Sequence, residues 1–142
     1  MQHQSLLEEI LDAYNTHDVP RIVAIYHPDY FGSLVSEGAG ISGLTDLHEK
    51  LTRLFLAFPD LQLAVEEMVS EENRIAIAWI ASGTQLGKIM NIPSTKKRLQ
   101  LKGQTILEIR DGKVARTRHL WDLASMLRQM GLLPELHPQG IL

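Results

Sequence analysis

The hydrophobic pattern of this chain changes its period once, and that change limits the folds open to it. In the first part, apolar residues such as Leu7, Ile10 and Tyr14 recur every three or four positions, as in an amphipathic helix. From Leu61 onward, apolar residues alternate with polar or small ones, as in a half-buried strand. A chain with helices first and strands afterwards is typical of an α+β domain, with helices packed on one face of the sheet.

Local signals place four helices. The first is expected over 4–15, and a short second helix follows Asp18 as N-cap, with Pro20 in its first turn. A third helix starts at Ser42 or Thr45 and ends before Pro59. The last helix carries Leu123, Met126, Leu127 and Met130, with Gly131 just past its end.

Strands are expected over 61–65, 74–82, 98–110 and 113–121, and 30–43 is a loop or an irregular strand. Asp111-Gly112 predicts a two-residue hairpin turn between the last two strands. We therefore expect one domain over 1–142, with a curved antiparallel sheet of about four to six strands. Three N-terminal helices cover one face and enclose a cavity, which is a natural place for a small ligand.

Composition excludes several classes of protein. The net charge of -3 gives no basic footprint, so nucleic-acid binding is not expected. No apolar run approaches the ~20 residues of a membrane helix, and no signal peptide is recognised, so the expected location is cytoplasmic. The chain has no cysteine and its six histidines are scattered, so we expect neither a metal site nor a cofactor.

Three stretches of the chain follow one another in a distinctive order. They read FPDLQLAVEEMVSEENRIAIAW, GTQLGKIMNIPSTKKRLQLKG and ILEIRDGKVARTRHLWDLASMLRQMG. With this order and spacing, nearly the whole chain resembles the SnoaL-like polyketide cyclase family of the nuclear-transport-factor-2-like superfamily. The resemblance implies a cone-shaped α+β fold, a homodimer, and cofactor-free acid–base chemistry next to a carbonyl group.

The resemblance also implies a catalytic residue. In the family cyclases an aspartate after the last strand acts as general acid/base, and Asp122 matches that position. The chain departs from the family where GTH becomes GTQ, ending in Gln85, and where Arg118 replaces an aromatic residue. The family loop PPTGK is PSTKK here, and a histidine after the second helix is absent from YFGS. From the residues alone, Asp122 is equally well explained as the N-cap of the last helix.

Strand alternation predicts which side chains share a face of the sheet. Residues 116, 118, 120 and 122 would lie together, and a regular hairpin would add Thr105, Leu107, Ile109 and Val114 to that face. His119 and Trp121 would then lie on the other face with Gln104, Ile106 and Glu108. Alternation does not say which face is inside. A buried Arg118–Asp122 pair would be structural or would bind a substrate oxygen.

Other residues are candidates for lining the cavity. His119 could act as an acid or base there, although such a histidine is more often a surface or interface residue. Trp79, Trp121 and Phe55 could contact an apolar ligand, and Tyr14, Tyr30 and Gln85 could orient a carbonyl. Each of these could instead be a core or loop residue.

Two functions from different classes remain open. The first is a cyclase or isomerase that acts on a small apolar carbonyl compound of polyketide type, with Asp122 and His119 as catalytic residues. The second is a protein that binds such a ligand, or serves as a homodimeric accessory subunit, without chemistry. Fold alone does not choose between them.

Overall fold

The structure is a computed structural model that describes residues 3–134. The helices and the 3-10 turn have these bounds: α1 Gln4–Asn15, α2 Val19–Ile25, η1 Val35–Glu37, α3 Gly43–Ala57 and α4 Leu123–Gln129. The strands have these bounds: β1 Tyr26–Leu34, β2 Ala39–Ser42, β3 Gln62–Glu71, β4 Arg74–Thr84, β5 Arg98–Arg110 and β6 Lys113–Trp121.

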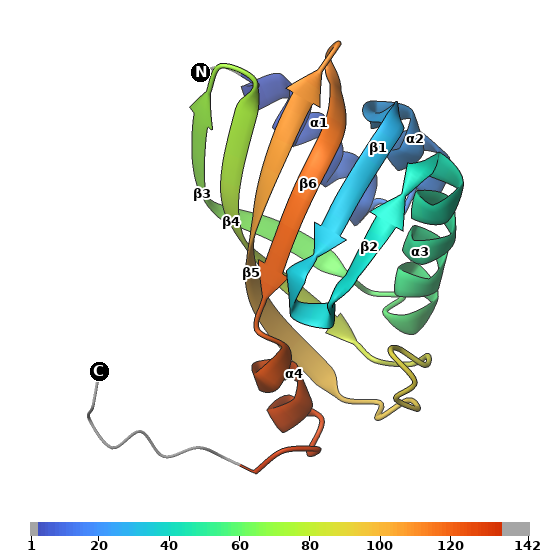
Figure 1. Ribbon diagram of the computed structural model, residues 1–142. Helices are drawn as coiled ribbons and strands as arrows, with labels where there is room; N and C mark the ends of the chain where they lie inside the picture. The colour runs from blue at the N-terminus through green and yellow to red at the C-terminus, as the bar shows by residue number, and fades with distance from the viewer. Residues whose placement is uncertain (1–2, 135–142) are drawn as a thin grey trace, which may run out of the picture.

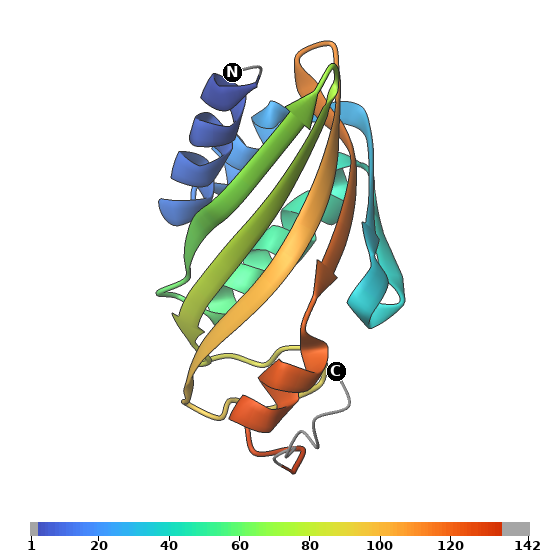
Figure 2. The same ribbon diagram turned by 90° about the vertical axis from the view of Figure 1, so that its left-hand side faces the viewer.

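The strands form one curved, six-stranded sheet in the order β2-β1-β6-β5-β4-β3. Helices α1, α2 and α3 lie on one face of this sheet, and α4 lies beyond the end of β6 (Figures 1 and 2). The α+β prediction, the helices on one face and the short last helix are therefore confirmed. None of the helices in residues 3–134 has the length and apolar character needed to cross a membrane.

The segment before α3 is more regular than the sequence suggested. Residues 26–42 form β1 and β2, an antiparallel pair, and β1 also pairs with β6 in parallel. The sheet is therefore mixed rather than wholly antiparallel. A parallel neighbour needs a long connection, and the chain between β1 and β6 provides it.

Two helix starts follow the predicted capping chemistry. The Asp18 carboxylate accepts a hydrogen bond from the backbone N–H of Arg21 at 3.1 Å, at the start of α2. The Asp122 carboxylate accepts one from the backbone N–H of Ser125 at 2.9 Å, at the start of α4. Both side chains satisfy an N–H group that the helix itself leaves without a partner.

The β5–β6 hairpin turns at Asp111-Gly112 as predicted, with φ of 54° and 72°. The register then shifts, because Ile109 pairs with Val114 whereas Glu108 pairs with Arg116. The extra residue is Ala115, which forms a β-bulge.

This bulge reverses the predicted grouping of side chains on β6. Thr105 pairs with His119 and Gly103 with Trp121, so these residues share a face, whereas Ile106 pairs with Arg118 on the opposite face. The predicted set of Arg118 with Thr105 and Leu107 is wrong, because one inserted residue exchanges the two faces of a strand.

A glycine in the middle of β5 leaves room for an aromatic ring on the inner face of the sheet. Gly103 pairs with Trp79 on one side and with Trp121 on the other. A Cβ atom on Gly103 would lie 2.3 Å from Cζ2 of Trp79, so the indole ring covers the position that a side chain would fill. The glycine therefore allows a large aromatic ring to lie flat against the sheet.

Candidate functional site

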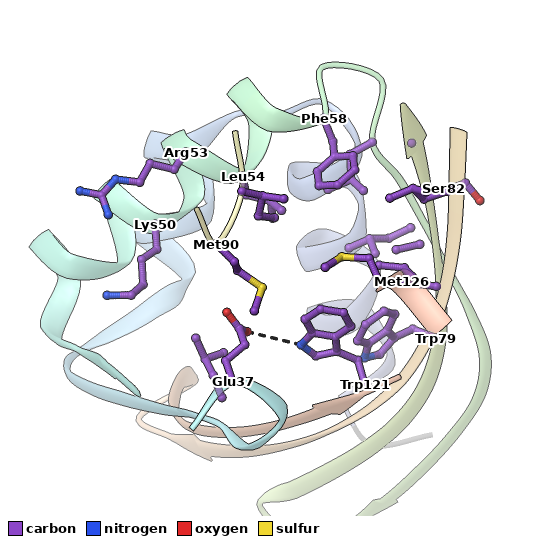
Figure 3. A pocket seen from close by; sticks show the side chains of 18 of the residues that line it. Glu37, Lys50, Arg53, Leu54, Phe58, Trp79, Ser82, Met90, Trp121 and Met126 are labelled. Carbon is purple, nitrogen blue, oxygen red and sulfur yellow. Dashed lines mark hydrogen bonds between the residues drawn. The ribbon is translucent and has the colours of Figure 1, made fainter. Parts of the chain in front are cut away.

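A cavity of about 390 Å³ lies between α3 and the inner face of the sheet, and we call it the large cavity. Figure 3 shows Trp79 and Trp121 projecting into it from the sheet, with Leu54 and Phe58 on the helical side. Most of the wall is apolar, and the ionisable groups among its lining residues are Glu37, Lys50, Arg53 and Lys88. Such a cavity suits an apolar ligand with a few polar atoms.

Glu37 reaches this cavity because its turn is bound to the end of β6. The Ser36 hydroxyl donates to the backbone carbonyl of Trp121 at 2.7 Å, and the Trp121 N–H donates to the Ser36 hydroxyl at 2.9 Å. The indole Nε1–H of Trp121 then donates to the Glu37 carboxylate at 3.4 Å (Figure 3). These bonds place an exposed carboxylate beside an aromatic wall of the cavity.

Three cations lie around the same cavity. Lys50 pairs with Asp46 at 2.7 Å, and this hydrogen bond is the main reason why the pKa of the Asp46 carboxyl is lowered. Arg53 and Lys88 make no ion pair with any residue in 3–134. They are therefore the cations best placed to attract an anionic group on a ligand.

A second cavity of about 170 Å³, the small cavity, lies between α1 and the sheet. Leu63 and Trp79 line both cavities, so these side chains form the wall between them. The polar groups at the small cavity belong to Tyr14, Tyr26, Trp79, Thr105 and His119. No carboxylate and no lysine or arginine is among its lining residues.

His119 is held by a chain of hydrogen bonds that starts at the dividing wall. The indole Nε1–H of Trp79 donates to the Thr105 hydroxyl at 2.9 Å, and that hydroxyl lies 2.8 Å from Nδ1 of His119. Burial lowers the pKa of His119 from 6.5 to about 4, because the protonated ring would lose its hydration. The imidazole is therefore neutral at pH 7 and is a weak base.

The two tyrosines at the small cavity are bonded to each other. The hydroxyls of Tyr14 and Tyr26 lie 3.0 Å apart. Burial raises the pKa of both phenols above the ordinary value, so both keep their protons at neutral pH. The small cavity thus contains neutral hydrogen-bonding groups, in contrast to the charged groups at the large one.

Asp122 and Arg118 lie outside both cavities. The Asp122 side chain is exposed and caps α4, and the hollow that it lines is on the outer side of the sheet, with Lys102 and Gln104. Arg118 is exposed on the same outer side. The two side chains therefore do not form the buried pair considered as one possibility, because the bulge at Ala115 turns Arg118 outward.

Gln85 is completely buried but does not line either cavity. Its Nε2 group donates to the carbonyls of Gly87, Ile92 and Pro93 at 3.2 to 3.3 Å. Its Oε1 accepts from the N–H and the hydroxyl of Thr95 at 3.0 and 2.6 Å. This replaces the expected ligand contact with a structural role, since Gln85 holds the connection between β4 and β5 in shape.

Tyr30 and Phe55, also expected to line the cavity, lie behind its walls. The Tyr30 hydroxyl forms a 2.6 Å hydrogen bond with that of Thr117. Phe55 stacks on the His17 ring, with centroids 4.2 Å apart, and meets Tyr14 edge to face. Neither side chain lines a cavity, so both are part of the packed core. Trp79, Trp121, Tyr14 and His119 do line cavities.

Sequence reasoning missed the ionisable residues of the large cavity. Glu37 lies in a segment that was expected to be irregular, and Lys50 and Arg53 lie on the polar side of α3. Lys88 lies in the connection between β4 and β5, for which no ligand contact was predicted. In the sequence, the only signal for Glu37 was its glycine-rich neighbourhood, which does not indicate the tertiary contact with Trp121.

In residues 3–134, no three metal-ligating side chains gather into a possible metal site.

A family model described as SnoaL-like polyketide cyclase matches residues 4–130. The chain has no match among curated proteins.

Solved structures are similar over nearly the whole chain. AclR from Streptomyces galilaeus, a proposed hydroxylase, is 28% identical with a TM-score of 0.84, covering 97% of this chain and 89% of AclR. TsrD from Streptomyces laurentii is 28% identical with a TM-score of 0.80, covering 92% of this chain and 95% of TsrD. A proposed SnoaL-like polyketide cyclase from Jannaschia sp. CCS1 shares the fold at 19% identity, with a TM-score of 0.83 and 94% of each chain covered.

Proposed function

Because the chain belongs to the SnoaL-like polyketide cyclase family, we propose that it is a cofactor-independent cyclase or isomerase for a small, largely apolar carbonyl compound. The observation that carries this proposal is the large cavity, which combines apolar walls with one carboxylate and several cations. An apolar chain or ring would be held in a shape close to the one that reacts. Such positioning supplies much of the rate of an intramolecular reaction.

Glu37 is the carboxylate that we assign as the base. Its side chain lies at the large cavity and accepts a hydrogen bond from the Trp121 indole, which directs one carboxylate oxygen toward that wall. It would remove a proton from the carbon next to the substrate carbonyl. Arg53 and Lys88 would stabilise the oxygen as it becomes enolate-like. A well-placed general base contributes ~10²–10⁴-fold to a rate.

Matched substitutions test which carboxylate acts. Glu37→Gln should lower the rate about 10²–10⁴-fold, since it removes the base. Asp122→Asn should leave the rate within about twofold, since asparagine is as good an N-cap as aspartate. The assay is deuterium exchange at the carbons next to the carbonyl of 2-tetralone in D₂O, followed by NMR. Because one neighbour is a proposed hydroxylase, uptake of dissolved oxygen is recorded in parallel.

Loss of exchange in Asp122→Asn, with full exchange in Glu37→Gln, would return the role to Asp122 and end our assignment. Two further observations favour the second candidate function, ligand binding without chemistry. Asp122 lies outside the cavities, and burial keeps the pKa of His119 at about 4, so neither group is a strong base inside the cone. Saturable ketone binding with no exchange above the buffer rate in the wild type would support that candidate.

We also propose that a second copy of the chain covers the outer face of the sheet. Phe31, Ile106 and Leu120 are exposed large apolar residues on this face. Sedimentation equilibrium should give a dimer for the wild type and a monomer for Ile106→Glu, because a buried charge opposes association. Leu56→Glu is the matched control, since Leu56 is exposed on α3, and this variant should remain dimeric. A monomeric wild type would contradict the proposal.

A further inference from the structure

The small cavity has a size that points to a particular kind of ligand. Its volume is about 170 Å³, and its apolar walls come from α1 and from strands β3 to β5, with Leu7, Ile77 and Leu107 among them. An engineered apolar cavity of about 150 Å³ is known to bind benzene. A single six-membered ring therefore fits the small cavity, whereas a fused ring system does not.

The hydrogen-bond chain at the wall fixes where the His119 proton lies. An indole N–H can only donate, so the Thr105 hydroxyl accepts the bond from Trp79. Thr105 is buried, and Nδ1 of His119 is the one acceptor found among residues 3–134 for the hydroxyl hydrogen, so we assign the hydroxyl as the donor to Nδ1. A neutral imidazole that accepts at Nδ1 carries its hydrogen on Nε2. The tautomer is therefore the one in which Nε2 is the donor.

This Nε2–H group has no partner in the part of the chain that the structure describes. Every buried side-chain nitrogen or oxygen in residues 3–134 has a hydrogen-bond partner, and no bond to Nε2 of His119 is found. Nε2 is therefore accessible, and the cavity that His119 lines is the small one. The cavity holds a donor that is ready for a ligand.

The tyrosine pair supplies a second donor. When one of the Tyr14 and Tyr26 hydroxyls donates to the other across 3.0 Å, the hydrogen of the accepting hydroxyl is left over. No acceptor for it is found among residues 3–134. Two donors and no carboxylate at one cavity favour a ligand atom that accepts two hydrogen bonds, and a carbonyl oxygen has two lone pairs for this purpose.

We propose that the small cavity is a separate binding subsite for one neutral ring that carries a carbonyl oxygen. The oxygen accepts hydrogen bonds from Nε2 of His119 and from the tyrosine pair, and the ring contacts the apolar walls. This subsite is distinct from the reaction that we assign to the large cavity. The proposal for the subsite is tested by a binding measurement, and its outcome does not depend on the result of the exchange assay.

The two tryptophans of the chain together distinguish the cavities, because Trp121 lines the large cavity and not the small one, whereas Trp79 lines both. Trp121 is bonded to Glu37 at the large cavity, and Trp79 is bonded through Thr105 to His119 at the small one. In a titration of ¹⁵N-labelled protein with cyclohexanone, the Trp79 indole N–H signal should move and saturate. The Trp121 signal should stay in place.

Variants at His119 test whether the ligand is bound through a hydrogen bond from this side chain or only through the fit of the ring to the cavity. His119→Phe keeps the ring shape but has no donor, so cyclohexanone should bind about tenfold more weakly, the usual effect of one hydrogen bond. His119→Gln places an amide N–H near the position of Nε2 and should retain most of the affinity. Val65→Phe, at a residue that lines the small cavity alone, should abolish the Trp79 shift by filling the space.

Three results would overturn the proposal. They are a saturating shift of the Trp121 indole signal, equal affinity for cyclohexanone in His119→Phe and the wild type, and full binding in Val65→Phe. A dispersed amide spectrum shows that each variant is folded. If His119→Phe fails to fold, His119→Gln and Val65→Phe still decide between the two cavities.

Discussion

The large and small cavities share one wall and differ in volume and in the charge of their lining residues. The large cavity of about 390 Å³ has a carboxylate and three cations at its lining. The small cavity of about 170 Å³ has hydroxyls, an indole and an imidazole that burial keeps neutral. A charged group keeps its charge only where water or a counter-ion reaches it. This contrast is the reason why we propose proton removal at the large cavity and binding of a neutral oxygen at the small one.

The largest expected effect comes from removing the wall. Trp79→Ala deletes an aromatic ring that separates the cavities and bonds to Thr105, so the free energy of unfolding should fall by about 3–5 kcal/mol. The merged cavity should then admit the two-ring ketone 2-tetralone as far as His119. Urea unfolding measures the first effect, and shifts of the His119 ring signals measure the second. A variant as stable as the wild type would contradict the first expectation. A variant in which 2-tetralone never reaches His119 would show that Trp79 does not separate the cavities.

A smaller effect concerns the charge state of the small cavity. The pKa of His119 is about 4 in the folded protein and about 6.5 when unfolded, so the unfolded chain binds more protons between these values. The stability contribution is therefore complete above pH 6.5 and is lost as the pH falls toward 4, by on the order of 3 kcal/mol. His119→Phe and His119→Gln should both show a flatter acid dependence in urea unfolding between pH 7 and pH 4. An unchanged slope in both would mean that the imidazole is hydrated.

The smallest effect concerns the charged lining of the large cavity. Arg53 is exposed and has no ion pair within residues 3–134, so Arg53→Gln should weaken an anionic apolar probe by only about twofold to fivefold, as is usual for exposed charge pairs. The probe is 8-anilinonaphthalene-1-sulfonate, followed by fluorescence at low salt. The neutral N-phenyl-1-naphthylamine is the control and should bind both proteins equally. The difference should shrink at high salt, and a persistent difference would argue against electrostatics.

Much of the fold was predictable because its signals are local. Helical spacing in the first part, alternation after Leu61 and the Asp111-Gly112 turn each depend on residues close together in the sequence. The caps at Asp18 and Asp122 are local in the same way, since each side chain bonds an N–H three residues later. The Asp122 cap was predicted alongside a catalytic role, and the position of this side chain outside both cavities supports only the cap.

The site was less predictable because it depends on which face of a strand each side chain occupies and on contacts between residues far apart in the sequence. The bulge at Ala115 follows Val114, and both residues are apolar and buried. Two adjacent apolar residues do not reveal in the sequence that one of them is an inserted residue. That one residue exchanges the faces on which His119 and Arg118 lie. Glu37 and Trp121 are 84 positions apart, and only the packing of the turn after β1 against the end of β6 brings them together.

By itself, the sequence determined the order of helices and strands, the hairpin turn and the helix caps, because each is set by interactions within a few residues. The tertiary structure alone decided which side chains face the cavities, that Trp79 and Leu63 divide the space in two, and that charge gathers on one side of them. Those properties depend on register and on burial, and burial arises only when the sheet curves around its helices.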